Sequence, residues 1–157
     1  SQLIFKSPAI LNGLRLIFVK GDNTLYSSNK HLNMMNAKHT EPLDPTTLAQ
    51  FTGTAQHWRV ARQFAITDGV KYLAETAACF WLIDAAISHL LEIGTADWFV
   101  LVRTEVSGSQ ATMIYEDGNG LERARQAIPY TDLQLPSVNF YAVWDSERWV
   151  IMLPSEY

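Results

Sequence analysis

The segment ITDGVKYLAETAACFWLIDAAISHLL, residues 66–91, is the only stretch of the chain long and apolar enough to be the spine of a domain. Thr67 or Asp68 supplies a side-chain oxygen for the first free amides of a helix, and Gly94 ends it. From Ala77 onward, apolar and small residues lie on nearly all sides, which is typical of a helix covered on most faces. The segment therefore predicts one long, buried helix.

Shorter helices are expected before this segment. Asp44 followed by Pro45 places a capping residue before a proline in the first turn, so a short helix should run through Phe51. We expect another helix over residues 55–64, which carries His57.

The chain after Gly94 changes to the two-residue period of strands. Asp117-Gly118-Asn119-Gly120 is a strong hairpin signal within it. Strands are expected at residues 98–106, 110–115, within 121–128, 138–144 and 149–153. We therefore predict an α+β fold for residues 41–157: N-terminal helices, with one long buried helix packed on an antiparallel sheet of four to five strands.

Charge divides the chain near residue 40. Residues 1–40 carry five Lys and Arg residues and one acid, a net charge of +4, whereas the remainder carries seven basic and fifteen acidic residues, a net charge of −8. No methionine precedes Met34. We interpret residues 1–40 as an irregular basic arm or upstream extension. An acidic domain argues against nucleic-acid binding, which needs clustered Lys and Arg.

The lone cysteine and the length of the apolar run indicate where in the cell the protein is located. Cys79 has no partner for a disulfide, so a reducing cytoplasm is the simplest location. The run over residues 77–91 is shorter than the roughly 20 residues needed to span a bilayer, and it contains Asp84 and His89. We expect a cytoplasmic protein without a membrane segment.

The first two turns of the long helix hold a group of polar residues. Asp68, Lys71, Tyr72 and Glu75 span about 10 Å, and the preceding segment could bring His57 alongside. One interpretation makes Glu75 or His57 a general base, with Lys71 as an electrostatic stabiliser. The other is structural: Asp68 caps the helix, Lys71 and Glu75 pair, and Tyr72 covers the core edge. We favour the structural interpretation.

Asp84 is an unusual charge in an apolar part of the helix, one turn from Trp81 and from Ser88. Because an unpaired buried carboxylate is costly, it must find a donor, face a cavity or lie at an interface. We favour a bond to Ser88, to a Trp indole or to a sheet-edge amide. A ligand pocket or a dimer contact is the alternative.

Motifs for metals, cofactors and nucleophiles are absent. The histidines form no HxxxH or HxH pair, and no CxxC motif accompanies them. Glycine-rich phosphate loops and a GxSxG elbow are also missing. We expect no metal site and no cofactor.

Several strings resemble a known family. They are FTGT at 51–54, TDGVKYLAE at 67–75, WLIDA at 81–85, YTD at 130–132 and LPSEY at 153–157. Over about residues 48–157 the chain resembles an uncharacterised family of small bacterial proteins, a domain of unknown function often found on plasmids or other mobile elements. The family has no established activity, cofactor or catalytic residue, so the resemblance implies none. The match at the end implies that the C-terminal residues are ordered.

Two functions remain open. The first is a non-catalytic protein-interaction module, homodimeric or partner-binding, that serves a mobile element; it rests on the acidic domain, the aromatic content and the absence of a catalytic motif. The second is a small enzyme or small-molecule binder with its site at the N-terminus of the long helix. We favour the first.

Overall fold

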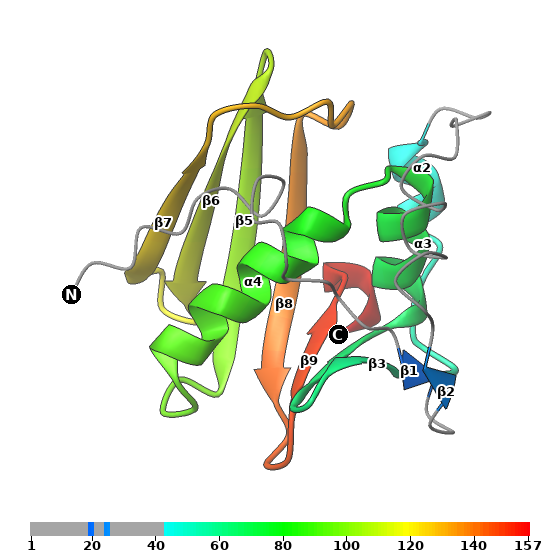
Figure 1. The fold of residues 1–157 in the computed structure, drawn as a ribbon, viewed down its shortest axis with the longest axis vertical. Coiled ribbons are helices and arrows are strands. Elements are labelled where there is room, and N and C mark those ends of the chain that lie inside the picture. Colours follow the sequence, from blue (N-terminus) through cyan, green and yellow to red (C-terminus); the bar gives the residue numbers. More distant parts are fainter. Residues whose placement is uncertain (1–18, 21–23, 26–42) are drawn as a thin grey trace.

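A nine-stranded sheet dominates the protein (Figure 1). The computed structural model describes residues 19–20, 24–25 and 43–157. Its strands are β1 (Val19–Lys20), β2 (Thr24–Leu25), β3 (Trp58–Ala61), β4 (Phe64–Ile66), β5 (Phe99–Ser107), β6 (Gln110–Asp117), β7 (Glu122–Ile128), β8 (Ser137–Trp144) and β9 (Trp149–Met152). Their order across the sheet is β2-β1-β3-β4-β9-β8-β5-β6-β7. Three α-helices, α2 (Pro45–Leu48), α3 (Asp68–Thr76) and α4 (Phe80–Ile93), and the 3₁₀ helix η1 (Pro154–Glu156) complete the described part.

The predicted fold class is wrong, because the sheet is larger and is mixed. Strand β4 pairs in parallel with β9, through Phe64 and Trp149 at one end and Ile66 and Ile151 at the other, whereas the other pairs are antiparallel. The five predicted strands are present as β5, β6, β7, β8 and β9, with bounds within about two residues, and β5, β6 and β7 form the predicted meander, whereas β8 pairs with β5 and β9. Sequence patterns did not reveal that the segment before α3 extends the sheet.

The predicted long helix is also wrong, because residues 66–91 divide between three elements. Ile66 ends β4, Asp68–Thr76 form α3, and α4 begins at Phe80. Ala78 has a φ of +48°, in the left-handed region, so the chain turns sharply between the two helices. The turn lets α3 contact β9 while α4 reaches β7.

The helix predicted over residues 55–64 is a hairpin instead. Strands β3 and β4 pair through Arg59 and Ala65 and through Ala61 and Phe64. All three residues of β4 are buried, because the strand lies between β3 and β9. The pairing with β9 joins segments more than 80 residues apart, and no local periodicity reports such a contact.

The core lies between α4 and one face of the sheet (Figure 1). Alternation along β5 buries Val100, Val102 and Thr104, and the β8 residues paired with all three and the β6 residues paired with Val102 and Thr104 are buried with them. The opposite face of β5, β6 and β8, here called the outer face, carries Phe99, Leu101 and Arg103, which stay partly exposed. Within the described residues, no helix is long and apolar enough to cross a membrane.

Local signals placed the start of the first helix and the hairpin turn correctly, but α2 ends at Leu48 and not at Phe51. The Asp44 carboxylate accepts a hydrogen bond from the Thr46 amide at 2.9 Å, and Pro45 occupies the first turn of α2. The predicted arm at residues 1–40 lies outside the described residues except for β1 and β2, and β1 joins the sheet where Val19 pairs with Arg59. The predicted boundary near residue 40 stays a prediction.

Candidate functional site

Asp68 fastens the loop before β3 to the start of α3. Its carboxylate accepts hydrogen bonds from the amides of Ala55 at 2.8 Å and Gln56 at 3.2 Å, and from the Trp58 indole at 2.8 Å. Its own amide donates to the Thr54 hydroxyl at 3.0 Å. Partial burial raises the pKa of this carboxyl, but these hydrogen bonds outweigh it and the pKa lies below its usual value. Asp68 is therefore held ionised by structural contacts.

Glu156 of η1, not Asp68, satisfies the first turn of α3. One carboxylate oxygen accepts from the Gly69 amide at 2.9 Å, and the other accepts from the Thr67 hydroxyl and from the Leu153 amide at 3.0 Å. A carboxylate at this end is favourable because free N–H groups give the helix a positive N-terminus. The TDG and LPSEY strings quoted for the family resemblance therefore meet each other in space.

Lys71, Tyr72 and Glu75 make the contacts of the structural interpretation. The Lys71 ammonium lies 2.7 Å from a Glu75 carboxylate oxygen and 4.5 Å from the centre of the Trp58 ring. The Tyr72 ring packs 5.4 Å from the Phe51 ring. The predicted pair of Lys71 and Glu75 is confirmed.

His57 is exposed on the loop that Asp68 fastens. The structure brings Asp68 and Lys71 to the same Trp58 ring, but within the described residues no hydrogen bond or ion pair joins His57 to Glu75. A catalytic or small-molecule site at this helix end stays a prediction.

Asp84 lies half-buried on α4 without a side-chain donor from the described residues. The Ser88 hydroxyl donates to the backbone carbonyl of Asp84 at 3.0 Å, not to its carboxylate. Burial raises the pKa of the Asp84 carboxyl to about 7. The favoured interpretation was a bond from the carboxylate to Ser88, to a Trp indole or to a sheet-edge amide, and within the described residues the carboxylate makes none of these bonds.

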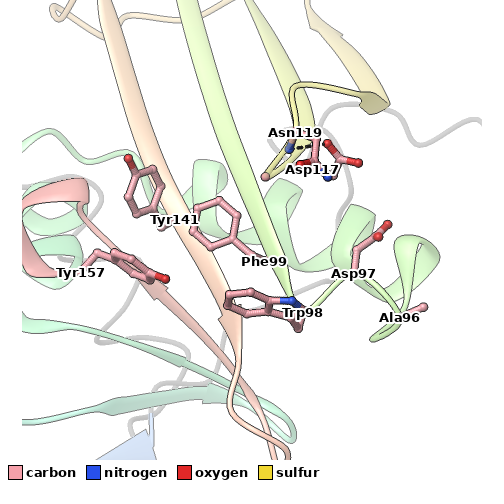
Figure 2. Close-up of a pocket in the computed structure, with 9 residues that line it drawn as sticks. Ala96, Asp97, Trp98, Phe99, Asp117, Asn119, Tyr141 and Tyr157 are labelled. Carbon is pink, nitrogen blue, oxygen red and sulfur yellow. Dashed lines mark hydrogen bonds between the residues drawn. The ribbon is translucent and has the colours of Figure 1, made fainter.

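A groove at one end of the outer face gathers aromatic side chains that the sequence did not single out. The groove encloses about 620 Å³ and is lined by residues 96–99, 117–119, Tyr141 and Tyr157 (Figure 2). Trp98 is 58% exposed and Tyr157 is 67% exposed, although both are large and apolar in part. We call this hollow the aromatic groove.

The rings of the aromatic groove contact one another. Phe99 lies 5.1 Å from Tyr141, 5.7 Å from Tyr157 and 5.9 Å from Trp98 between ring centres. The antiparallel register explains the first contact: Leu101 pairs with Tyr141, so Phe99 is its diagonal neighbour on the same face. Tyr157 comes from beyond η1, and only the tertiary fold brings it here.

Carboxylates stand across the groove from the rings (Figure 2). Asp117 accepts the amides of Asn119 at 2.8 Å and Leu121 at 2.9 Å in the hairpin turn, and these bonds hold the pKa of its carboxyl below the usual value. Arg123 lies 2.7 Å from an Asp97 oxygen and 3.9 Å from an Asp117 oxygen. The polar wall therefore consists of charges fixed in place.

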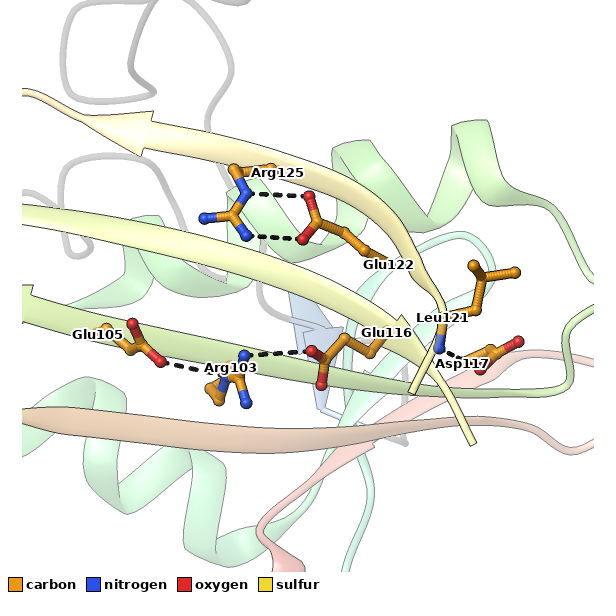
Figure 3. A network of polar contacts seen from close by, with 7 residues as sticks. All are labelled: Arg103, Glu105, Glu116, Asp117, Leu121, Glu122 and Arg125. Carbon is orange, nitrogen blue, oxygen red and sulfur yellow. Dashed lines mark hydrogen bonds and ion pairs between the residues drawn. The ribbon is translucent and has the colours of Figure 1, made fainter. Parts of the chain in front are cut away.

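The neighbouring part of the outer face is covered by its own ion pairs (Figure 3). Arg103 pairs with Glu116 at 3.1 Å, and Arg125 pairs with Glu122 at 2.7 Å. The register sets Ile114 between the two arginines, and Ile114 is only 3% exposed. Because arginine stems can cover apolar surface while their heads stay in water, this region is closed. The aromatic groove lies beyond this covered region.

Strand alternation was the sequence signal that could have found part of this groove. Trp98-Phe99 begins a predicted strand and Tyr141 lies in its predicted neighbour, so alternation places Phe99 and Tyr141 away from the core face. No pattern could have added Tyr157. Among the described residues, no three His, Cys, Asp or Glu side chains are placed to hold a metal ion.

The fold and the groove define a sheet-based domain with one helix-covered face and one aromatic groove. A family model described as a family of unknown function, DUF6876, matches residues 44–157. The match covers more than half of the chain, so the chain belongs to this family. The resemblance to an uncharacterised domain is thereby confirmed. No curated protein and no solved structure matches the chain.

Proposed function

We propose that the chain is a non-catalytic protein-interaction module and that the aromatic groove is its contact surface. The observation that carries the proposal is the exposure of Trp98 and Tyr157 around an open hollow of about 620 Å³. Trp and Tyr are enriched among the residues that contribute most to protein binding, because they bury a large area and keep a polar tip. Binding would remove these rings from water.

The acids near the groove support binding over proton transfer. A general base works best with a pKa near the working pH. Hydrogen bonds lower the pKa of the Asp117 carboxyl, and Arg123 pairs with Asp97. At the start of α3, Asp68 accepts three donors and Lys71 is paired with Glu75. These groups favour the non-catalytic function.

A partner other than a second copy fits the charge better. Residues 41–157 carry seven basic and fifteen acidic residues, so two copies meeting at their grooves would bring like charges together. We also propose that the protein acts in a bacterial cytoplasm and that it serves a mobile element. The lone buried Cys79 supports a reducing compartment, and the sequence resemblance supports the setting.

The test compares matched surface variants in a pull-down from the native host. Trp98→Ala and Tyr157→Ala remove groove rings, whereas Leu91→Ala and Tyr130→Ala remove exposed residues outside it; Tyr130 is 72% exposed. We expect the groove variants to lose at least about tenfold in partner capture, as central interface residues do. The two controls should capture like the wild type.

Every variant is first checked for folding by circular dichroism and thermal melting. Capture that survives Trp98→Ala and Tyr157→Ala, or that falls equally with the control variants, would contradict the proposal. The absence of any specific partner in the wild-type pull-down would also count against it.

A further inference from the structure

The rings of the aromatic groove form a corner and not a flat platform. The ring planes of Phe99 and Tyr141 meet at 60°, those of Phe99 and Tyr157 at 72°, and those of Tyr141 and Tyr157 at 86°. Nucleobases and sugar rings stack on a flat aromatic face. A corner of tilted rings instead surrounds a compact, rounded group on several sides.

The polar wall of the groove has an excess of negative charge. Asp97 and Asp117 stand opposite the rings, and Arg123 is the only basic residue of the described part paired with them. Because Arg123 lies 2.7 Å from Asp97 but 3.9 Å from Asp117, it balances one carboxylate and leaves the other mostly uncompensated. An anionic occupant is therefore disfavoured, and a cation is favoured.

Lysine combines the features that these two walls require. Its four-carbon stem is apolar, and its ammonium is a compact point charge, whereas the planar arginine head suits flat stacking and two-pronged contacts. A cation held against aromatic faces is attracted by their electron-rich centres.

We infer that the aromatic groove takes a lysine side chain of the partner protein, an inference that rests on the proposed function. The stem and the ammonium lie in the corner formed by Phe99 and Tyr157, and the ammonium is on the side that faces Asp117. Trp98, which lines the groove and is 58% exposed, covers the segment of the partner that carries the lysine (Figure 2).

The test uses two small probes that differ in one charge. Nα-acetyl-lysine N-methylamide carries the ammonium, and Nα-acetyl-norleucine N-methylamide has the same stem without it. Each is titrated into the full chain while the indole N–H signal of Trp98, assigned with Trp98→Phe, is followed by NMR. We expect the signal to move with the lysine probe at a concentration at least about threefold lower than with norleucine.

Two variants change the charge of the groove in opposite directions. Asp97→Asn removes a negative charge and should weaken binding of the lysine probe by about two- to fivefold. Arg123→Gln removes the competing cation and should strengthen binding of the lysine probe by about two- to fivefold. Neither variant should change binding of the norleucine probe. An unchanged norleucine affinity shows that the variants alter the charge of the groove and not its shape.

Equal binding of both probes, weaker lysine binding in Arg123→Gln, or no shift with either probe would overturn the inference. These results are distinguishable from failure of the proposed function. If partner capture depends on Trp98 and Tyr157 but the lysine probe binds no better than norleucine, the proposed function stands and the groove takes an uncharged group. If the lysine probe binds preferentially but partner capture does not depend on Trp98 and Tyr157, the proposed function is overturned instead.

Discussion

Gly69 shows how a single residue can be fixed by the close approach of another part of the chain. A Cβ at this position would lie 2.7 Å from the Leu153 side chain and 2.8 Å from the Glu156 carboxyl carbon. The same Glu156 carboxylate accepts the Gly69 amide. An added methyl group would therefore have to displace the Leu153 and Glu156 side chains, and this close approach links the start of α3 to η1.

Gly69→Ala should destabilise the protein. Replacement of glycine by alanine within a helix usually raises the free energy of unfolding by about 0.5–1 kcal/mol. Here the overlap with Leu153 and Glu156 should cost about 1–3 kcal/mol, so the net change should be a loss of stability. Urea unfolding measures the difference. The control is Gly53→Ala, where an added Cβ meets nothing within 4 Å; a wild-type or higher stability in Gly69→Ala would contradict the close approach.

The titration of Asp84 should make stability depend on pH. Burial raises the pKa of its carboxyl to about 7, whereas an aspartate in an unfolded chain titrates near about 3.9. Between these values the folded state binds more protons than the unfolded state. The free energy of unfolding should therefore fall as the pH rises from about 4 to about 7, with the full loss present above that range.

Asp84→Asn removes this loss. At pH 8 we expect the variant to be more stable than the wild type by on the order of 1–3 kcal/mol, with a flatter profile between pH 4 and 7. Thermal melting at several pH values measures both effects. Glu147→Gln, at an exposed turn, should keep the wild-type profile. A variant less stable than the wild type at pH 8 would mean that the ionised carboxylate is itself stabilising.

Among the elements, the turn between α3 and α4 is the feature that the sequence concealed most completely. Residues 66–91 read as one helix because, from Val70 to Leu91, alanines and large apolar residues recur without glycine or proline. The chain nevertheless turns at Ala78, with a φ of +48°. Packing of α3 and α4 on different strands stabilises a backbone conformation that alanine alone disfavours.

Ala78→Gly should therefore stabilise the protein. The left-handed conformation costs alanine about 1–2 kcal/mol and costs glycine little, and this gain exceeds the greater entropy that glycine loses on folding. We expect about 0.5–1 kcal/mol in the free energy of unfolding by urea titration. Ala85→Gly, inside α4, should destabilise by about 1 kcal/mol. A loss of stability in Ala78→Gly would show that its methyl group matters more than its backbone conformation.

Local sequence signals were sufficient to predict an element where the hydrogen bonds that define it join residues close in the chain. The Asp44-Pro45 start of α2 and the Asp117 turn use hydrogen bonds between residues two to four apart, so their sequence predicts them. The strands β5 to β8 alternate because one face is buried by α4. Residues 58–66 lacked such a signal, since β4 is buried throughout and β3 is short.

At the scale of the whole molecule, the parallel pairing of β4 with β9 decides the architecture. It joins the hairpin before α3 to the last strand, so β3 and β4 extend the antiparallel part of the sheet into a mixed sheet. The Glu156 contacts with Thr67 and Gly69 then fasten the end of the chain beside the same junction. Together they place Tyr157 against Phe99 and Tyr141 in the aromatic groove.

The candidate site has the same dependence on non-local contacts. Phe99 and Tyr141 belong to strands that the sequence predicted, and their shared face follows from alternation. The polar residues chosen from helix spacing, Asp68, Lys71 and Glu75, were correctly placed near one another, but each contacts structural partners. Spacing along a helix reports neighbours on that helix and says nothing of which partners the rest of the chain supplies.

The sequence by itself determined the strands after Gly94, the hairpin turn at Asp117, the cap of α2 and the acidic balance of residues 41–157, because each depends on residues close in the chain or on composition alone. Only the tertiary structure decided the break at Ala78, the mixed sheet and the aromatic groove. These features depend on contacts between distant segments, whose free energy outweighs the local preferences that a sequence pattern records.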